Sequence, residues 1–215
     1  GTRSHGEEAV KLFIGCNDHD TLLLFSDRGV AYALPAYRVP QCSRTAKGTP
    51  VVQLLPIPRE EAITSLLAVS EFNDDTDLLM LTQGGFIKRT RLSAFSNIRS
   101  NGLIAIGLED GDALTWVRLS IPGDSVLIGS KAGMTIHFRL ADGELRPLGR
   151  TARGVRSMNL RKGDSLVSMD VLPAELADQI AASADDVGDG DDAGDVAETA
   201  VAAERPWVLV ASASG

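Results

Sequence analysis

A basic motif that ends in glycine occurs three times in this chain at nearly constant spacing. It is clearest at Arg150–Arg156 (RTARGVR), with an earlier copy at Arg44–Gly48 (RTAKG) and a diverged one at Arg99–Gly102 (RSNG). Each copy follows a short apolar run that ends in another glycine, and the two glycines are 19, 17 and 21 residues apart. A period of about 50 residues is typical of units that stack and bury one another's apolar faces. We therefore expect a repeat protein.

Each repeat is predicted to contain four short strands. In the first, Thr21–Phe25 and Val30–Ala33 flank the turn at Asp27-Arg28-Gly29 and form a hairpin. Val51–Leu55 and Ile63–Val69 complete that unit. The same pattern predicts strands in the second and third repeats at Leu78–Leu81, Phe86–Arg89, Leu103–Leu108, Ala113–Leu119, Val126–Ile128, Met134–Arg139, Val155–Leu160 and Leu166–Val171.

Four strands per repeat and few helical patterns favour an all-β, propeller-like array of four-stranded blades. A β-sandwich or barrel is the structural alternative, but neither explains the internal repetition. Gly29, Gly85 and Gly133 are expected at equivalent hairpin turns, at least one of them with a positive φ. The predicted units are a remnant of a preceding blade (1–19), three complete blades (20–73, 74–122 and 123–172), an acidic insert (173–204) and the start of a further blade (205–215).

The negative charge of the chain is concentrated in one segment. The formal net charge is −8, but residues 175–204 hold ten acidic residues and no Lys or Arg, which leaves +2 for the rest. This segment is rich in Ala, Asp and Gly and cannot bury enough apolar surface to fold. We expect a short helix over residues 173–181 and disorder over residues 182–204.

No enzyme site is predicted. His5, His19 and His137 are scattered, no G-x-S-x-G motif occurs, and Gly84-Gly85 precedes a strand rather than the helix of a phosphate loop. Cys16 and Cys42 have no partners at metal-binding spacing and are interpreted as buried or idle thiols. We expect no catalytic residue, metal or cofactor. The chain has no apolar run of 18 residues and no signal pattern, so it is interpreted as a cytoplasmic protein without membrane contact.

Arg and Lys recur near the second glycine of each repeat. Blades placed side by side would bring these side chains to one rim, where they would form a surface for the backbone of double-stranded DNA. Backbone contact implies recognition of shape rather than of sequence. The alternative is a propeller that binds proteins and uses these charges only for solubility. The predicted DNA-binding residues are Arg38, Arg44, Lys47, Lys88, Arg89, Arg91, Arg99, Arg139, Arg146, Arg150, Arg153 and Arg156.

Three segments carry a family resemblance. They are Lys88-Arg89-Thr90 followed by Phe95–Ile106 (FSNIRSNGLIAI), then Pro147–Arg156 (PLGRTARGVR), and Ser43–Thr49 (SRTAKGT). With them the chain resembles the C-terminal domain of the A subunit of bacterial DNA gyrase, over residues 8–172 and again over 205–215.

The resemblance implies a β-pinwheel, a propeller-like disc whose blades exchange strands and around whose basic rim DNA is bent. It further implies a nucleoid-associated, non-catalytic module whose partners are the N-terminal domain of the A subunit and the B subunit. In that assembly, wrapping directs ATP-dependent strand passage toward negative supercoils. The family's catalytic tyrosine lies in the N-terminal domain, so Tyr32 and Tyr37 are expected to be core or surface residues.

The sequence departs from the family pattern in three ways. The family disc usually has six blades, whereas this chain offers three complete ones with fragments, and the acidic insert is not shared. The basic, glycine-rich heptapeptide that marks gyrase is absent. The C-terminal disc of the topoisomerase IV A subunit, which lacks that heptapeptide, therefore stays open as an alternative.

Overall fold

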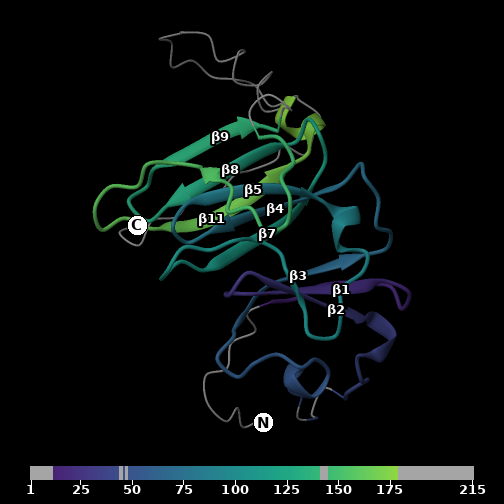
Figure 1. Ribbon diagram of the computed structural model, residues 1–215. Coiled ribbons are helices and arrows are strands. Elements are labelled where there is room, and N and C mark those ends of the chain that lie inside the picture. The colour runs from purple at the N-terminus through teal and green to yellow at the C-terminus, as the bar shows by residue number, and fades with distance from the viewer. Residues whose placement is uncertain (1–11, 44–45, 47, 141–144, 179–215) are drawn as a thin grey trace, which may run out of the picture.

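The computed structural model describes residues 12–43, 46, 48–140 and 145–178, which fold into three antiparallel sheets (Figure 1). The first sheet has the strand order β3-β1-β2-β6, the second β10-β5-β4-β7 and the third β11-β8-β9. The all-β class is therefore confirmed. The strands are β1 (Thr21–Ser26), β2 (Val30–Pro35), β3 (Ile63–Val69), β4 (Asp77–Thr82), β5 (Phe86–Arg91), β6 (Leu103–Ile104), β7 (Leu114–Ser120), β8 (Ser125–Ser130), β9 (Thr135–Arg139), β10 (Val155–Arg156) and β11 (Leu166–Leu172).

Short helical segments connect the strands. The described residues include the 3-10 helices η1 (Ala36–Arg38), η2 (Val51–Gln53) and η3 (Leu92–Phe95). Residues 174–178 are helical and lie within the helix expected at 173–181, whereas the rest of the acidic insert, the start of the further blade and most of the 1–19 remnant lie outside the described residues. Within the described part of the chain, no helix is long and apolar enough to cross a membrane.

Neighbouring repeats exchange their outermost strand. β6 belongs to the second repeat in sequence but pairs with β2 of the first sheet, and β10 of the third repeat pairs with β5 of the second sheet. The sequence prediction that placed Leu103–Leu108 and Val155–Leu160 in their own repeats is therefore wrong. An apolar pattern predicts a strand but does not identify the sheet edge that receives it, because long-range packing decides that edge. This exchange is the one expected of a pinwheel.

One predicted strand of the first repeat is also wrong. Residues 51–53 form the 3-10 helix η2, whose N-cap is Pro50. Proline donates no backbone hydrogen bond, so Pro50 and Pro56 on either side disfavour a paired strand here. The segment instead places Leu55 and Ile57, both buried, against Leu22 and Leu24 on the outer face of the first sheet. The fourth strand of this sheet is β6, from the next repeat.

The three hairpins have the same turn. Gly29, Gly85 and Gly133 have φ values of 74°, 88° and 81°, which confirms the predicted positive φ at all three positions. Each glycine N–H donates to the carbonyl oxygen three residues earlier at 3.0 Å, and a hydroxyl at that earlier position, from Ser26, Thr82 or Ser130, accepts from the residue after the glycine. The turn is thus encoded locally by a hydroxyl residue and a glycine.

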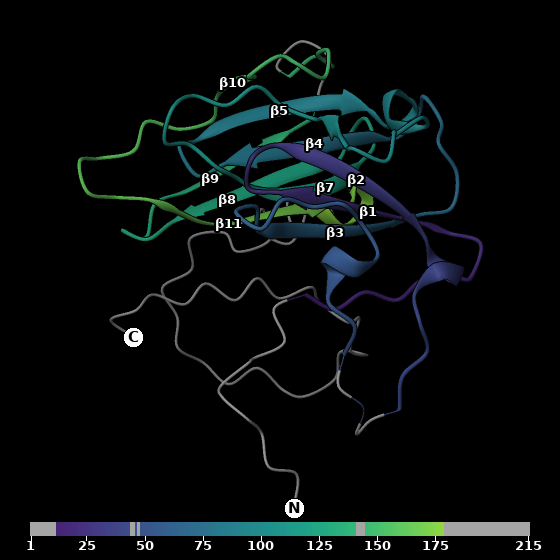
Figure 2. The ribbon, with the colours of Figure 1, turned by 60° about the horizontal axis from the view of Figure 1, so that its bottom comes forward.

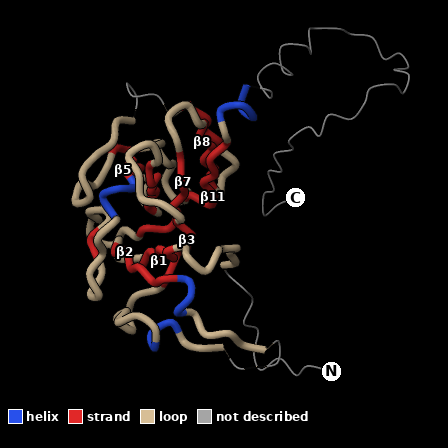
Figure 3. Tube along the Cα trace, turned by 90° about the vertical axis from the view of Figure 1, so that its right-hand side faces the viewer, coloured by secondary structure: helices blue, strands red, loops and turns tan. Residues whose placement is uncertain are grey.

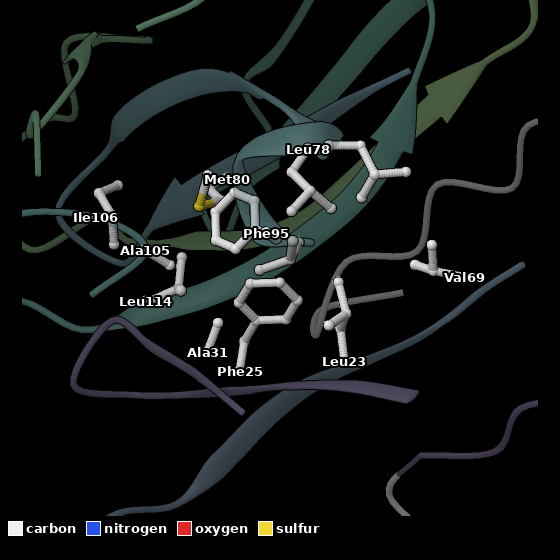
Figure 4. Packing of buried hydrophobic residues seen from close by; sticks show 12 residues of the cluster. Leu23, Phe25, Ala31, Val69, Leu78, Met80, Phe95, Ala105, Ile106 and Leu114 are labelled. Atoms are coloured by element: carbon white, nitrogen blue, oxygen red, sulfur yellow. The ribbon is translucent and has the colours of Figure 1, made fainter. Parts of the chain in front are cut away.

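The sheets stack in chain order, with the second between the first and the third (Figures 2 and 3). Successive side chains of a strand point to opposite faces. Leu78 and Met80 of β4 therefore pack against Leu23 and Phe25 of the first sheet (Figure 4), while the intervening leucines of β4 join the core with the third sheet. The Phe25 ring meets Phe95 edge to face at 6.3 Å.

Opposite edges of the sheets have different surroundings. β3 abuts β7 of the next sheet, where Thr64 Oγ1 donates to the Leu114 carbonyl at 2.8 Å and the Val117 N–H donates to Ser65 Oγ at 3.0 Å. β6 and β10 lie at the other edge of the first and second sheets. The basic motifs lead directly into β6 and β10. The arginines of these motifs therefore lie at this edge, which is termed the outer edge.

Candidate nucleic-acid interface

Two segments that cross from one sheet to the outer edge of the preceding one carry the basic motifs. The first crossing loop (residues 99–107) contains β6, and the second crossing loop (residues 148–158) contains β10. Leu103 and Ile104 pair with Ala31 and Val30, as Val155 and Arg156 pair with Ile87 and Phe86. The two loops therefore occupy equivalent places on successive sheets.

The motif glycine lets each loop lie flat on the strand below. Gly102 has φ 81°, and a Cβ there would lie 2.6 Å from Val30 Cγ1. Gly154 has φ 97°, and its Cβ would lie 2.3 Å from the Ile87 carbonyl oxygen. No side chain fits at such distances, and the positive φ disfavours one as well. The close approach of loop and strand therefore requires glycine at the second glycine position of the repeat.

Both loops are then anchored at a hairpin glycine. The Ala105 N–H donates to the Gly29 carbonyl and the Ser157 N–H to the Gly85 carbonyl, each at 2.8 Å. The next residue in each loop is buried, Ile106 at 2% exposure and Met158 at 7%. Each crossing therefore uses two of the repeated glycines. The carbonyl of the hairpin glycine accepts the hydrogen bond that anchors the loop, and the motif glycine of the next repeat lets the loop backbone approach the strand.

The second crossing loop presents its arginines on an aromatic ring. The guanidinium carbons of Arg153 and Arg156 lie 4.4 Å and 4.9 Å from the centroid of Phe86, which is itself buried. Both side chains are exposed, and Arg150, half-buried, donates from Nη1 to the Ala94 carbonyl at 3.4 Å. Stacking on a ring restrains a guanidinium while leaving its N–H groups free to donate. Phe86 was missed from the sequence; its position directly after the turn glycine is the signal that could have identified it.

Acidic side chains limit the basic surface on one side. Arg153 forms an exposed ion pair with Glu109. A hollow beside Arg156 is lined by Glu109, Asp110, Asp112 and Asp164, among others. An exposed ion pair contributes at most about 1 kcal/mol, so Glu109 leaves Arg153 open to exchange for another anion.

The first crossing loop lacks equivalent charges. Counted from the motif glycine, Asn101 takes the place of Arg153 and Ile104, 56% exposed, that of Arg156. Arg99 is exposed and is the one basic residue in this loop. The recurrence of Arg and Lys near the second glycine of each repeat is therefore not a strict repetition: Arg44 and Lys47 stand at the same distances from Gly48 as Arg150 and Arg153 from Gly154, whereas the motif of the first crossing loop has Arg99 alone, at a different distance from Gly102.

Two predicted DNA-binding residues are buried. Lys88 and Arg89 both have 0% exposure. Arg89 Nε lies 2.9 Å from Asp77 Oδ2, and Arg91 Nη1 lies 3.6 Å from Asp77 Oδ1. The charge of Arg89 is thus used inside the protein, where a buried cation needs a partner. A side chain without exposed surface does not reach a phosphate, so the DNA-binding assignment of Lys88 and Arg89 is withdrawn.

Lys88 connects the two crossing loops. Its ammonium donates to the carbonyl oxygens of Ala105 at 2.5 Å, Gly149 at 3.2 Å and Arg150 at 2.5 Å. Three N–H groups thereby meet three acceptors. Burial, with a smaller contribution from the charge of Arg150, lowers the pKa of Lys88 to about 8.

The remaining predicted basic residues are dispersed. Arg38 and Arg146 are exposed, Arg91 is half-buried, and Arg139 is exposed and paired with Asp178. Arg44 and Lys47 lie outside the described residues. The second crossing loop therefore carries Arg150, Arg153 and Arg156, whereas the other exposed predicted residues that the structure describes lie outside this loop.

Residues considered for other chemistry have structural surroundings. Tyr32 is buried and donates to Glu61 at 3.0 Å, whereas Tyr37 is exposed, as the core or surface assignment required. Burial, together with Glu61, raises the pKa of Tyr32 to about 12. Cys16 and Cys42 are exposed free thiols, so of the two expected alternatives, buried or idle, burial does not hold for either residue and idle thiols stay a prediction. His137 is exposed on β9, and the described part of the chain contains no group of acidic, His or Cys residues that could hold a metal.

The sequence matches a known protein family. A model described as "DNA gyrase C-terminal domain, beta-propeller" matches residues 20–70, 76–120 and 124–173. The DNA gyrase A subunit of Synechocystis sp. is 54% identical over 211 residues, covering 97% of this chain and 24% of that protein. The chloroplastic/mitochondrial DNA gyrase A subunit of Arabidopsis thaliana is 41% identical over 209 residues, covering 97% of this chain and 21% of that protein. The chain therefore spans about a quarter of the length of these relatives.

Solved structures agree with the fold. The C-terminal domain of DNA topoisomerase IV has a TM-score of 0.64 and 27% identity, covering 72% of this chain and 48% of that chain. The DNA gyrase A C-terminal domain has a TM-score of 0.59 and 29% identity, covering 71% of this chain and 48% of that chain. The strand-exchanged sheets, the three matched repeats and the similarity to gyrase A subunits lead to one assignment: the chain belongs to the DNA gyrase C-terminal domain family.

Proposed function

We propose that this chain binds the backbone of double-stranded DNA along the outer edge of its sheets. The observation that carries the proposal is the pair of exposed guanidinium groups of Arg153 and Arg156, held on Phe86 beside Arg150. Guanidinium groups donate in a fork geometry that suits phosphate oxygens. Restraining the side chains before binding reduces the conformational entropy that contact with DNA would cost.

The proposed contact reads shape rather than sequence. The arginines lie on strand β10 and the turn before it, and the described segments offer no exposed helix of sufficient length to enter a major groove. Basic side chains on the outer edge of the stacked sheets would contact successive parts of the DNA phosphate backbone as the duplex bends along the stack. We therefore propose that the chain bends DNA around this edge.

In the larger protein, we propose that this module wraps DNA for a type IIA topoisomerase. Its partners are then the N-terminal domain of the A subunit, which carries the catalytic tyrosine, and the B subunit, which hydrolyses ATP. Wrapping presents a crossover of defined sign to the cleavage gate, so strand passage introduces negative supercoils. The family match and the similarity to gyrase A subunits support this proposal, which places the protein in the cytoplasm with the nucleoid.

A mobility-shift experiment tests the proposal with duplexes of increasing length. The full chain is expected to bind longer duplexes more tightly, and Arg150→Ala/Arg153→Ala is expected to weaken binding about tenfold for all sequences alike. Arg59→Ala/Arg118→Ala removes the same charge away from the second crossing loop and is expected to change binding less. Binding that is absent, or equally weakened by both double variants, would reject this surface and favour a propeller that binds proteins.

A further inference from the structure

The buried ammonium of Lys88 holds two loops that belong to different repeats. One acceptor, the Ala105 carbonyl, lies in the first crossing loop, and the other two, the carbonyls of Gly149 and Arg150, lie in the second. Lys88 itself belongs to β5, the strand with which β10 of the second loop pairs. The bond to Ala105 is buried and the bonds to Gly149 and Arg150 are partly buried, so losing the ammonium would leave at least the buried Ala105 carbonyl without its donor.

The two crossing loops also contact each other directly. The Gly107 N–H, at the end of the first loop, donates to the Ala152 carbonyl of the second at 3.1 Å. A Cβ at Gly107 would lie 2.7 Å from the Thr151 carbonyl oxygen, so the backbones approach closely. The Leu148 N–H donates to the Arg89 carbonyl at 2.7 Å and fixes the start of the second loop. The position of the second loop is therefore set by β5 and by its neighbour.

We infer that Lys88 is a positioning residue for DNA binding, which couples adjacent crossing loops and places Arg150 and Arg153 without touching DNA. This inference rests on the proposed function. Lys88 bonds the carbonyl of Arg150 itself, and the Gly107 contact lies one residue before Arg153. A shift of the Arg150 carbonyl moves Arg150 itself, and a shift of the Ala152 carbonyl moves Arg153, the next residue. A duplex that follows the outer edge contacts both loops, so it requires that their relative position be fixed.

Tyr32 supplies a matched control. It lies three residues after Gly29, as Lys88 lies three residues after Gly85, and each is covered by a motif glycine. A Cβ at Gly102 would lie 2.8 Å from Tyr32 Cε1, and one at Gly154 would lie 3.0 Å from Lys88 Cβ. Tyr32, however, bonds Glu61 rather than loop carbonyls. Replacing either residue with Met disturbs the same place in the fold, but only one replacement removes the coupling.

The experiment compares Lys88→Met and Tyr32→Met in the full chain by two measurements. The first is hydrogen exchange at the Gly107 amide, which we expect to accelerate about tenfold in Lys88→Met and little in Tyr32→Met. The second is affinity for a duplex long enough to follow the edge, which we expect to fall about fivefold or more in Lys88→Met alone.

The outcomes separate the inference from the proposed function. Unchanged exchange at Gly107 in Lys88→Met would overturn the coupling, whether or not the chain binds DNA. Faster exchange with unchanged affinity would overturn the positioning role, provided that Arg150→Ala/Arg153→Ala still weakens binding. Equal losses of affinity in both Met variants would also overturn it, because general destabilisation would then explain the effect. If the parent chain does not bind DNA, the proposed function and the positioning role fail together, whereas the coupling is still decided by exchange.

Discussion

The two crossing loops have the same backbone path and different side chains. Each uses a glycine to lie on an outer strand, and each is anchored by a hydrogen bond to a hairpin glycine. The second loop adds Arg150, Arg153 and Arg156, whereas the first has Arg99 alone. Below the second loop lies Lys88, and below the first lies Tyr32. The comparison indicates that glycines and backbone bonds specify the crossing, while the charges vary independently of it.

The largest expected effect comes from replacing the motif glycine, a residue that each loop requires at the equivalent position. Gly154→Ala places a Cβ about 2.3 Å from the Ile87 carbonyl at a positive φ, so we expect it to lower the free energy of unfolding by about 3 kcal/mol. Gly149→Ala is the control in the same loop, because no atom lies within 4 Å of its Cβ position. Urea denaturation measures both. Equal, small effects would show that close approach is not what selects Gly154.

The hairpins could be predicted from sequence because their determinants are local. The hydroxyl of Ser26, Thr82 or Ser130 and the glycine three residues later specify the turn within one window. Strand exchange could not be predicted this way, since β6 and β10 are short strands whose partners lie about 70 residues away in sequence.

Residue type also misled the site prediction on β5. Lys88 and Arg89 are basic residues of a repeat in which Arg and Lys recur, and this recurrence predicted a place on the basic rim. Both are buried because the second crossing loop covers β5, with Asp77 balancing Arg89 and loop carbonyls receiving Lys88. β9, which has no such covering strand in the described chain, keeps alternate side chains exposed. The cluster of Arg153 and Arg156 on Phe86 needed the strand register, which sequence alone did not provide.

A smaller effect is expected from pH. The folded pKa of Lys88 is about 8, below its ordinary value of 10.5, because of burial and then the charge of Arg150. Between these two values the unfolded chain binds more protons, so the free energy of unfolding rises with pH. From pH 8 to pH 10 we expect the parent to gain on the order of 2 kcal/mol relative to Lys88→Met. Denaturation of both proteins across this range measures it, and parallel pH profiles would contradict the assigned burial.

The smallest expected effect comes from making the first loop resemble the second. Asn101→Arg/Ile104→Arg places guanidinium groups at the positions equivalent to Arg153 and Arg156. Since Val30 stands where the second loop has Phe86, the new side chains have no ring to restrain them. We expect affinity for a long duplex to rise by no more than about 1 kcal/mol. An unchanged affinity in a folded variant would show that DNA does not follow the first loop.

The most direct test of the central claim is the salt dependence of duplex binding by Arg153→Ala/Arg156→Ala. Each lost phosphate contact reduces the slope of log K against log salt by about 0.9. If both guanidinium groups on Phe86 bind phosphates, the slope falls by somewhat less than two units from that of the parent, while hydrogen exchange of the core strands is unchanged. A slope equal to that of the parent, in a variant that folds normally, would show that the DNA contacts lie elsewhere.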